Sequence, residues 1–293
     1  MQMFNLKTHI KAGSVDEAIT LLVENPNARL IAGGTDVLIK LREGKSEFSH
    51  LVDIHGLAEL KFIRQDKEKN ILIGSGSVFS DIIRSELIQT QIPMLCDAAQ
   101  SVGGPQIRNI ATIGGNICNG VTSADSASSL FALNALVVIK GENKTREIPI
   151  SQFYLGPGKV DLKRGDVLTA IKITPENYEG SFGHYYKYAM RNAMDIATIG
   201  CAVSLKTKNQ KLTDFRIAYG VAGPVPIRCP NTENAVINRT ISRTLINEIS
   251  QTIERDVSPR TSWRASREFR LNIIKELSKR ATITALKRAG EEV

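Results

Sequence analysis

Two short glycine passages constrain the fold of this chain more than any other feature of its sequence. The first is Ala32-Gly33-Gly34-Thr35-Asp36, and the second is Thr112-Ile113-Gly114-Gly115-Asn116. Each passage follows an apolar run and contains polar side chains beside its glycines. Because glycine has no Cβ, its backbone can adopt positive φ, and its N–H groups can come close to a ligand. Successive N–H groups that point in one direction form a binding site for an anion.

Two such passages that face each other can hold the two phosphates of one pyrophosphate group. Four side chains would then offer hydrogen bonds beside the phosphates, namely those of Thr35, Asp36, Thr112 and Asn116. Asp125 follows the second passage closely, and its carboxylate can bond a ribose or ribitol hydroxyl. The alternative is that each glycine pair marks a tight turn and that Asp125 caps a turn or a helix. The residues alone leave both interpretations open.

The common nucleotide-binding fingerprints are missing from the sequence. Gly74-Ser75-Gly76 lacks the third glycine of G-x-G-x-x-G because Phe79 stands at that position, and the motif G-x-x-x-x-G-K-[ST] does not occur. We therefore expect neither a Rossmann fold nor a P-loop NTPase. The four histidines form no H-E-x-x-H motif, and the four cysteines are far apart without a C-x-x-C pair. This pattern predicts reduced thiols and no metal or iron–sulfur site made by this chain alone.

Helices and strands are predicted to alternate early in the chain and to separate late. Ser14-Val15-Asp16-Glu17 is a capping box that opens a helix. Apolar or alternating runs predict strands at 28–32, 51–54, 167–173, 196–205 and 212–221. Two further helices are predicted at 242–255 and 265–288. This order is typical of the α+β class, and the polar segment 174–180 predicts a boundary between one domain over 1–176 and another over 177–293.

Positive charge is concentrated near the C-terminal end. The net charge is +8, and ten lysines and arginines lie between Arg255 and Arg288. A solvated helix face explains this charge, and docking to a partner subunit is the alternative. We do not expect nucleic-acid binding because Trp263 and Phe269 are the only aromatic residues nearby. The sequence shows neither an apolar run of the roughly 18 residues that a membrane span needs nor the layout of a secretory signal, which predicts a cytoplasmic protein.

The two glycine passages are part of a longer series of motifs that resembles a known family. The series consists of Ala32-Gly33-Gly34-Thr35-Asp36, Pro105-Gln106-Ile107-Arg108-Asn109, Thr112-Ile113-Gly114-Gly115-Asn116-Ile117-Cys118-Asn119-Gly120 and Asp125. In this order and spacing it is similar to the FAD-binding medium subunit of the molybdenum hydroxylases, and most of all to that of bacterial xanthine dehydrogenases. The similarity spans the whole chain, since it includes Arg228, Pro259-Arg260 and Ser262-Trp263-Arg264-Ala265-Ser266.

The resemblance implies a fold and a cofactor site. The fold is a vanillyl-alcohol-oxidase-type FAD-binding domain of two α+β subdomains, about 1–55 and 56–176, followed by a C-terminal α+β domain. The pyrophosphate of FAD would lie on the two glycine passages. The implied FAD-binding residues are Arg29, Leu30, Ile31, Ala32, Gly33, Gly34, Thr35, Asp36, Val102, Thr112, Ile113, Gly114, Gly115, Asn116, Asp125, Leu168 and Lys187. Val102 stands near the position of a phenylalanine that lies against the flavin in animal relatives, so the chain departs from the family pattern there.

The resemblance also implies partners and an electron acceptor. A large subunit would carry the molybdopterin cofactor and oxidise a purine, and a small subunit would carry [2Fe–2S] clusters. This chain would take electrons from those clusters through FAD and pass a hydride to NAD⁺. Asp195 is then expected near the nicotinamide or, alternatively, as a carboxylate that caps its own loop. Two other functions stay open: the flavin subunit of another molybdenum hydroxylase, acting on carbon monoxide, aldehydes or N-heterocycles, and a flavin-free scaffold.

Overall fold

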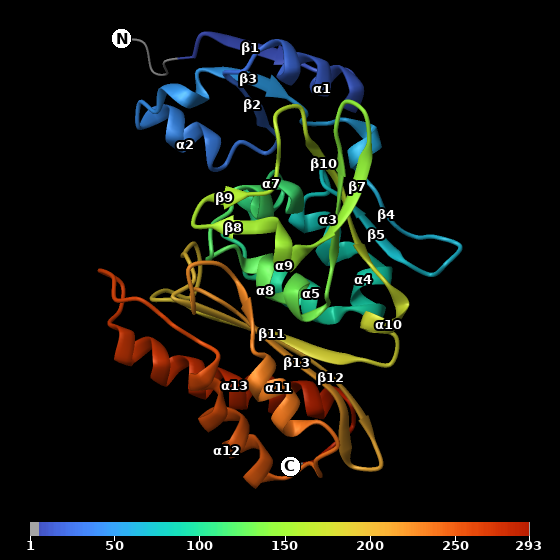
Figure 1. The fold of residues 1–293 in the computed structure, drawn as a ribbon, viewed down its shortest axis with the longest axis vertical. Coiled ribbons are helices and arrows are strands. Elements are labelled where there is room, and N and C mark those ends of the chain that lie inside the picture. Colours follow the sequence, from blue (N-terminus) through green and yellow to red (C-terminus); the bar gives the residue numbers. More distant parts are fainter. Residues whose placement is uncertain (1–5, 293) are drawn as a thin grey trace.

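The structure is a computed structural model, and it describes residues 6–292. Its N-terminal part, at the top of Figure 1, is a small parallel sheet. The strands lie in the order β1 (Thr8–Lys11), β3 (His50–Asp53) and β2 (Ala28–Ile31). Helix α1 (Val15–Glu24) packs beside them and begins as predicted, because the Ser14 hydroxyl accepts a hydrogen bond from the Glu17 N–H at 3.0 Å. Helix α2 (Val37–Arg42) follows β2, so the first glycine passage is the β2–α2 connection.

The middle part is a five-stranded antiparallel sheet covered by short helices. The strands lie in the order β4 (Ile63–Gln65), β5 (Ile71–Gly74), β10 (Val167–Ile173), β6 (Leu136–Lys140) and β7 (Thr145–Pro149). The helices are α3 (Phe79–Arg84), α4 (Glu86–Gln91), α5 (Pro93–Gln100), α6 (Pro105–Arg108), α7 (Ile113–Cys118), α8 (Asp125–Ala132) and α9 (Ile150–Phe153). Every residue of α8 is buried, so this helix lies inside the molecule.

The C-terminal part is a four-stranded antiparallel sheet with helices on both faces. Its strands are β11 (Phe182–Tyr188), β12 (Ile199–Lys208), β13 (Lys211–Gly220) and β14 (Ile227–Arg228). Helices α5 and α8 of the middle part contact one face, and α13 (Arg267–Arg288) contacts the other, as Figure 1 shows. Alternate residues of β12 therefore join different cores: Ala202 packs with the middle part, whereas Cys201 and Val203 pack with α13. The remaining elements are β8 (Tyr154–Gly156), β9 (Lys159–Val160), α10 (Pro175–Tyr178), α11 (Pro230–Val236), α12 (Arg243–Thr252) and the short 3₁₀ segments 46–48, 58–60 and 253–255.

The predicted α+β class is confirmed, and most of the predicted strands are present. The connection between the two long strands is shorter than expected, because β12 and β13 continue up to Asn209 and Gln210. Both of these residues have positive φ, +52° and +57°, which is the geometry of a tight two-residue hairpin turn. The predicted helices 242–255 and 265–288 correspond to α12 and α13, which begin after the capping side chains of Ser242 and Ser266. Strands β1 and β11 were not predicted, since neither shows a long apolar run.

Candidate functional site

The first glycine passage leaves a row of backbone donors without acceptors. Residues 32–36 connect the end of β2 to the start of α2, and Gly34 has a positive φ of +72°. The Gly34 carbonyl accepts from the Leu38 N–H at 2.9 Å, which fixes the first turn of α2. Within residues 6–292, the N–H groups of Gly33, Gly34, Thr35 and Asp36 donate to no protein group. Four free donors in a row are what the anion-site interpretation of this passage requires.

The second glycine passage is built differently, and the prediction of a second row of free N–H groups is wrong. The passage is the first turn of helix α7, with Thr112 as the capping residue. Its four N–H groups, on residues 113–116, are all occupied by protein acceptors. The Ile113 and Gly114 N–H groups donate to the carbonyls of Ser77 and Ser75, while the other two donate to the Thr112 side chain and carbonyl. A ligand can therefore accept hydrogen bonds from the polar side chains of this passage but not from its backbone N–H groups.

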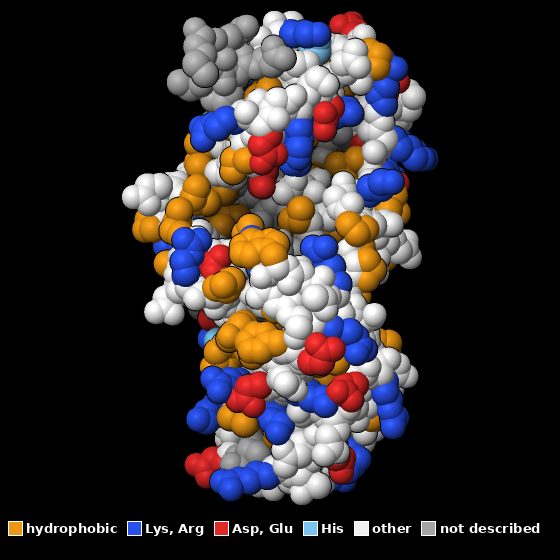
Figure 2. Space-filling model, turned by 90° about the vertical axis from the view of Figure 1, so that its left-hand side faces the viewer, with side chains coloured by type: hydrophobic (Ala, Val, Ile, Leu, Met, Phe, Trp, Pro, Cys, Tyr) orange, Lys and Arg blue, Asp and Glu red, His pale blue; other side chains and the backbone are white. Residues whose placement is uncertain are grey.

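The glycines of both passages are needed because other backbone segments approach them closely. A Cβ atom at Gly33 would lie 2.1 Å from the Ile110 carbonyl oxygen, just before the second passage. A Cβ atom at Gly114 would lie 2.6 Å from Ser75, in the loop after β5. Absence of the side chain therefore lets the first passage pack directly against the chain that leads into the second. Figure 2 shows the surface hollowed between the upper and the middle part of the molecule, at the level at which these parts meet in Figure 1.

One side chain of the second passage, that of Asn116, keeps a free polar group. The Asn116 carboxamide oxygen accepts from the Ser126 hydroxyl at 2.6 Å, which orients the amide. Its Nδ2 group donates to no acceptor within the described part of the chain. Lys40 of α2 donates to the Asn119 side chain at 2.8 Å, and this contact ties α2 to the end of α7. The two passages are thus joined at both ends, by the Gly33 contact and by this hydrogen bond.

A buried ion pair brings together two of the predicted residues, Asp125 and Lys187. Lys187 Nζ donates to Asp125 Oδ2 at 2.9 Å and to the Ser101 carbonyl at 3.0 Å. Tyr185 donates from its hydroxyl to Asp125 Oδ1 at 3.0 Å. Burial raises the pKa of the Asp125 carboxyl, and the Lys187 ammonium and the two hydrogen bonds oppose this rise. Both oxygens of Asp125 are therefore occupied, and the pair links α8 of the middle part to β11 of the C-terminal part.

Three other predicted residues lie outside this cluster. Arg29 is exposed on β2, where its guanidinium donates to the Ala28 carbonyl at 3.3 Å, so residues 29–31 are strand and not loop. Leu168 is buried in β10 opposite Ile139 of β6. Val102 is buried in the largest hydrophobic cluster. The Leu168 and Val102 side chains therefore belong to the hydrophobic core, whereas that of Arg29 is exposed.

The segment 189–197 forms an exposed loop that closes against a third glycine pair, Gly103-Gly104. A Cβ atom at Gly104 would lie 2.7 Å from the Met194 sulfur, and the Met194 N–H donates to the Gly103 carbonyl at 3.3 Å. Asp195 accepts from the N–H groups of Arg191, at 2.9 Å, and Ile196, at 2.8 Å. Burial raises the pKa of Asp195, but these hydrogen bonds outweigh that effect and hold it below its ordinary value. Asp195 thus caps its own loop.

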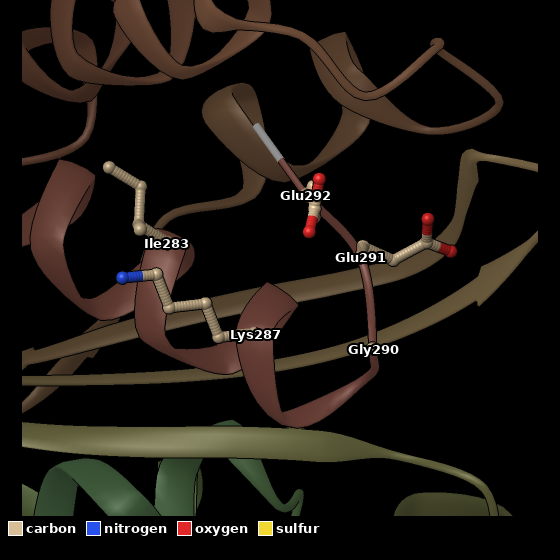
Figure 3. Close-up of a pocket in the computed structure, with 5 residues that line it drawn as sticks. All are labelled: Ile283, Lys287, Gly290, Glu291 and Glu292. Carbon is tan, nitrogen blue, oxygen red and sulfur yellow. The ribbon is translucent and has the colours of Figure 1, made fainter.

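The cavity drawn in Figure 3 lies elsewhere in the molecule. It has a volume of about 470 Å³ and is lined by Ile283, Lys287, Gly290, Glu291 and Glu292 at the end of α13. In Figure 3 the Lys287 side chain extends away from the two glutamates. None of the predicted cofactor residues lines it. Among residues 6–292, no helix is long and apolar enough to cross a membrane, and no group of three His, Cys, Asp or Glu side chains is arranged to hold a metal ion.

Comparisons with known proteins agree with this geometry. A family model described as the FAD binding domain in molybdopterin dehydrogenase matches residues 2–176, and one described as the CO dehydrogenase flavoprotein C-terminal domain matches residues 184–285. The chain is 44% identical to a xanthine dehydrogenase FAD-binding subunit of Escherichia coli O157:H7 over 288 residues, which cover 98% of this chain and 99% of that protein. It is 30% identical to the carbon monoxide dehydrogenase medium chain of Hydrogenophaga pseudoflava, covering 94% of this chain and 96% of that one.

Solved structures show the same fold. The carbon monoxide dehydrogenase from Hydrogenophaga pseudoflava that lacks the Mo-pyranopterin moiety superimposes with a TM-score of 0.91 at 28% identity, and the match covers 97% of this chain and 98% of that chain. Quinoline 2-oxidoreductase from Pseudomonas putida 86 also superimposes with a TM-score of 0.91, at 23% identity, covering 98% of this chain and 99% of that chain. The second likeness concerns the fold alone.

Proposed function

Because this chain belongs to the FAD-binding medium subunits of the molybdenum hydroxylases, we propose that it is the electron-transfer subunit of a cytoplasmic xanthine dehydrogenase-like complex. In this proposal residues 1–176 bind FAD and residues 177–293 form the second domain. FAD, when bound, accepts electrons singly and delivers two of them together as a hydride. The chain itself needs no acid–base pair for this task, since its residues have to hold and orient the cofactor.

The observation that carries the proposal is the row of unpaired N–H groups on the first glycine passage. Four consecutive donors, on residues 33–36, have no acceptor among residues 6–292, which suits the charged oxygens of a diphosphate. The Gly33 contact holds this row against the chain that leads to the Thr112 hydroxyl and the Asn116 amide. The backbone N–H groups of the first passage would bind the diphosphate, and the Thr112 and Asn116 side chains of the second passage would also hydrogen-bond to it.

The Asp125–Lys187 pair would act beside the flavin. A buried carboxylate with its cation fixes a polar environment in which FAD hydroxyls or ring atoms can be hydrogen-bonded. Leu168 and Val102 are buried in the same hydrophobic cluster as Ile113 of the second passage, and we propose that they shape the cofactor site by packing. The Asp195 carboxylate accepts two hydrogen bonds from N–H groups of its own loop. We therefore propose that Asp195 shapes the 189–197 loop near the electron acceptor and does not itself contact the nicotinamide.

We propose a molybdopterin-binding large subunit and a [2Fe–2S] small subunit as partners, and NAD⁺ as the electron acceptor. Support comes from the full-length similarity to a protein named as a xanthine dehydrogenase FAD-binding subunit. The second candidate is the flavin subunit of another molybdenum hydroxylase, supported by the similarity to a carbon monoxide dehydrogenase medium chain. The higher identity, 44% against 30%, favours the first.

The test is purification of the chain with its partners, followed by anaerobic mixing with xanthine and NAD⁺. We expect a yellow complex with one FAD per copy of this chain and formation of NADH. Reduction of the flavin by carbon monoxide, an aldehyde or an N-heterocycle, but not by xanthine, would establish the second candidate. A colourless chain that does not bind added FAD would instead support a function as a flavin-free scaffold. Flavin reduction without NADH would disprove NAD⁺ as the acceptor and keep the rest of the proposal.

A further inference from the structure

A tight turn before helix α13 presents an exposed tryptophan. Ser262 and Ala265 bond to each other across the turn, through N–H···O bonds of 3.0 Å and 3.3 Å, and leave Trp263 and Arg264 at its tip. Trp263 is 79% exposed, the largest exposure among the large hydrophobic side chains of the described residues. The Arg264 guanidinium lies 4.2 Å from the centre of the indole ring. A single exposed ring is ordinary on a protein surface, and it marks a contact site only together with the charged and apolar side chains around it.

The turn is surrounded by arginines that have no acidic partner. Within the described part of the chain, no carboxylate lies within ion-pair distance of Arg255, Arg260, Arg264, Arg267 or Arg270. In contrast, three basic side chains farther along α13 are paired: Lys275 with Glu254, Arg280 with Glu276 and Arg288 with Asp97. Lys275, Arg280 and Arg288 therefore hold their positive charge in ion pairs, whereas the five arginines around the start of α13 form none within the described residues.

A buried arginine holds this turn in place. Arg270 is 2% exposed, and its guanidinium donates to the Thr198 carbonyl and, at 2.9 Å, to the Ser262 hydroxyl. Burial and then the charges of Arg260 and Arg264 lower the pKa of Arg270, so three cations lie close together. Among the described residues no carboxylate forms an ion pair with any of the three, and the positive end of the α13 dipole adds to the same field. The turn is preorganised, and its field is positive.

Apolar side chains extend the surface beyond the turn. Phe269, 42% exposed, packs at 5.8 Å against Tyr188 at the end of β11. The loop that follows Tyr188 exposes Met190, Met194 and Ile196. In Figure 1 the segment leading into α13 lies at the left-hand edge of the molecule, the side that faces the viewer in Figure 2, where hydrophobic side chains lie among lysines and arginines. We call the residues Met190, Met194, Ile196, Trp263, Arg264 and Phe269, together with Arg260, the Trp263 surface.

We propose that the Trp263 surface is the docking site for a partner subunit, whose facing surface is acidic and has an apolar pocket for the indole ring. This inference rests on the proposed function. A protein partner fits better than a small anion, because Trp263 projects into solvent at the tip of the turn, and neither the cavity at the end of α13 nor the one beside α1 includes it. Tryptophan and arginine are the residues on which binding energy concentrates at protein interfaces. Carboxylates on the partner would supply the charge that the unpaired arginines lack.

The single tryptophan of the chain makes the test direct. With 5-fluorotryptophan incorporated into this chain only, its ¹⁹F spectrum contains one resonance, from Trp263. We expect this resonance to shift and to lose its H₂O/D₂O solvent effect when the unlabelled partner subunits are added to the FAD-loaded chain. A resonance that keeps the free-chain position and full solvent effect in the assembled complex would disprove the docking site. FAD content and NADH formation, measured on the same sample, report separately on the proposed function.

Matched variants test the energetic contribution. Trp263→Ala should weaken subunit association by roughly 30-fold, the size of a hot-spot residue. The charge reversal Arg260→Glu with Arg264→Glu should weaken it and reduce its salt dependence. Lys208→Glu with Lys211→Glu, a pair of residues at the β12–β13 hairpin turn, is the control with the same change of charge, and it should leave association unchanged. Equal effects of both reversals would contradict a local docking surface.

Two outcomes would assign the surface to another class of partner. A ¹⁹F shift on adding heparin or duplex DNA, with none on adding the partner subunits, would identify a polyanion site and overturn the proposal. A shift that depends on the concentration of this chain alone would identify self-association and overturn it as well. Because Trp263 is exposed, its replacement should leave the unfolding temperature and the FAD content of the free chain unchanged, which separates lost docking from lost folding.

Discussion

The backbone of Gly33 lies directly against the carbonyl oxygen of Ile110, so close that a Cβ at residue 33 would come within 2.1 Å of it. Gly33→Ala must therefore push the first glycine passage away from the second. We expect the affinity for FAD to fall about tenfold or more, a loss of about 1.4 kcal/mol. The measurement is titration of FAD into the flavin-free variant, with thermal unfolding recorded in parallel.

Gly156→Ala is the control for this change. Gly156 has no heavy atom within 4 Å of the position that a Cβ would occupy, and its φ is not positive. FAD affinity and unfolding temperature should match those of the unchanged chain. If Gly33→Ala bound FAD as the control does, the first passage would not depend on its contact with Ile110, and the proposed diphosphate site would be wrong.

The two glycine passages show how far the sequence can predict this site. Locally they look alike, and the sequence left the same two interpretations, an anion site or a tight turn, open for both; in the structure only the first has free N–H groups among the described residues. The second differs because carbonyls of Ser75 and Ser77, far away in sequence, accept its N–H groups. No local pattern signals that pairing, since it depends on how the loop after β5 folds back on α7. For the same reason the buried contact of Asp125 with Tyr185 could not be read from spacing.

The fold was predictable where local patterns dominate. The Ser14 cap, the strand 167–173 and the long C-terminal helix each follow from side chains within a few residues. Strand β11 escaped prediction because its side chains face two different environments: Tyr185 packs with the middle part, and Tyr186 packs with the C-terminal core. Such a strand shows neither a clear alternation of apolar and polar residues nor a continuous apolar run.

Thr112→Ala tests the cap of α7. Its hydroxyl accepts the Gly115 N–H at 3.0 Å, and removing such a cap costs about 1 kcal/mol of stability. Under the proposed function the same hydroxyl also contributes to FAD binding, so the variant should lose affinity for FAD. Thr112→Ser keeps the oxygen and should retain both properties. Chemical denaturation and FAD titration measure the two effects, and an equal loss in both variants would count against the hydroxyl.

Lys187 and Asp125 should show strong energetic coupling. In Lys187→Met the carboxylate stays buried without its cation, its pKa rises further, and the free energy of unfolding should fall by about 3 kcal/mol. The double variant with Asp125→Asn removes both charges and should be less destabilised than the sum of the two single variants, by about 1 kcal/mol or more. A double-mutant cycle by chemical denaturation measures this coupling. Additive losses would show that the pair does not act as a unit.

Asp195 is predicted to act through its loop. Asp195→Asn keeps one oxygen that can accept from the Arg191 or Ile196 N–H, whereas Asp195→Ala keeps none. We expect the alanine variant to be cleaved faster by protease within the 189–197 loop and to form NADH more slowly, with the asparagine variant closer to the unchanged chain. Loss of NADH formation in the asparagine variant, with its loop still resistant to protease, would instead assign the carboxylate a direct role at the acceptor.

A final prediction concerns pH, through the contact that joins the last helix to the middle part. Asp97 of α5 accepts from Arg288 of α13 at 2.7 Å and 3.0 Å, and it bonds to His184 of β11 at 2.7 Å. Burial raises the pKa of Asp97, but His184 and Arg288 outweigh it and hold the pKa below its ordinary value. The pKa of an Asp in an unfolded chain is about 3.9. In acid, the unfolded chain therefore binds a proton at Asp97 more readily than the folded chain does.

The network therefore stabilises the protein fully above about pH 4 to 5, and this contribution is lost as the pH falls through the lowered pKa of Asp97. Asp97→Asn should lower the free energy of unfolding by about 2 kcal/mol at neutral pH. The difference between the two proteins should shrink below about pH 4, because the unchanged carboxyl then takes up its proton. Denaturant unfolding across this range measures the difference, and a gap that stays constant down to about pH 3 would show that Asp97 holds the helix by shape and not by charge.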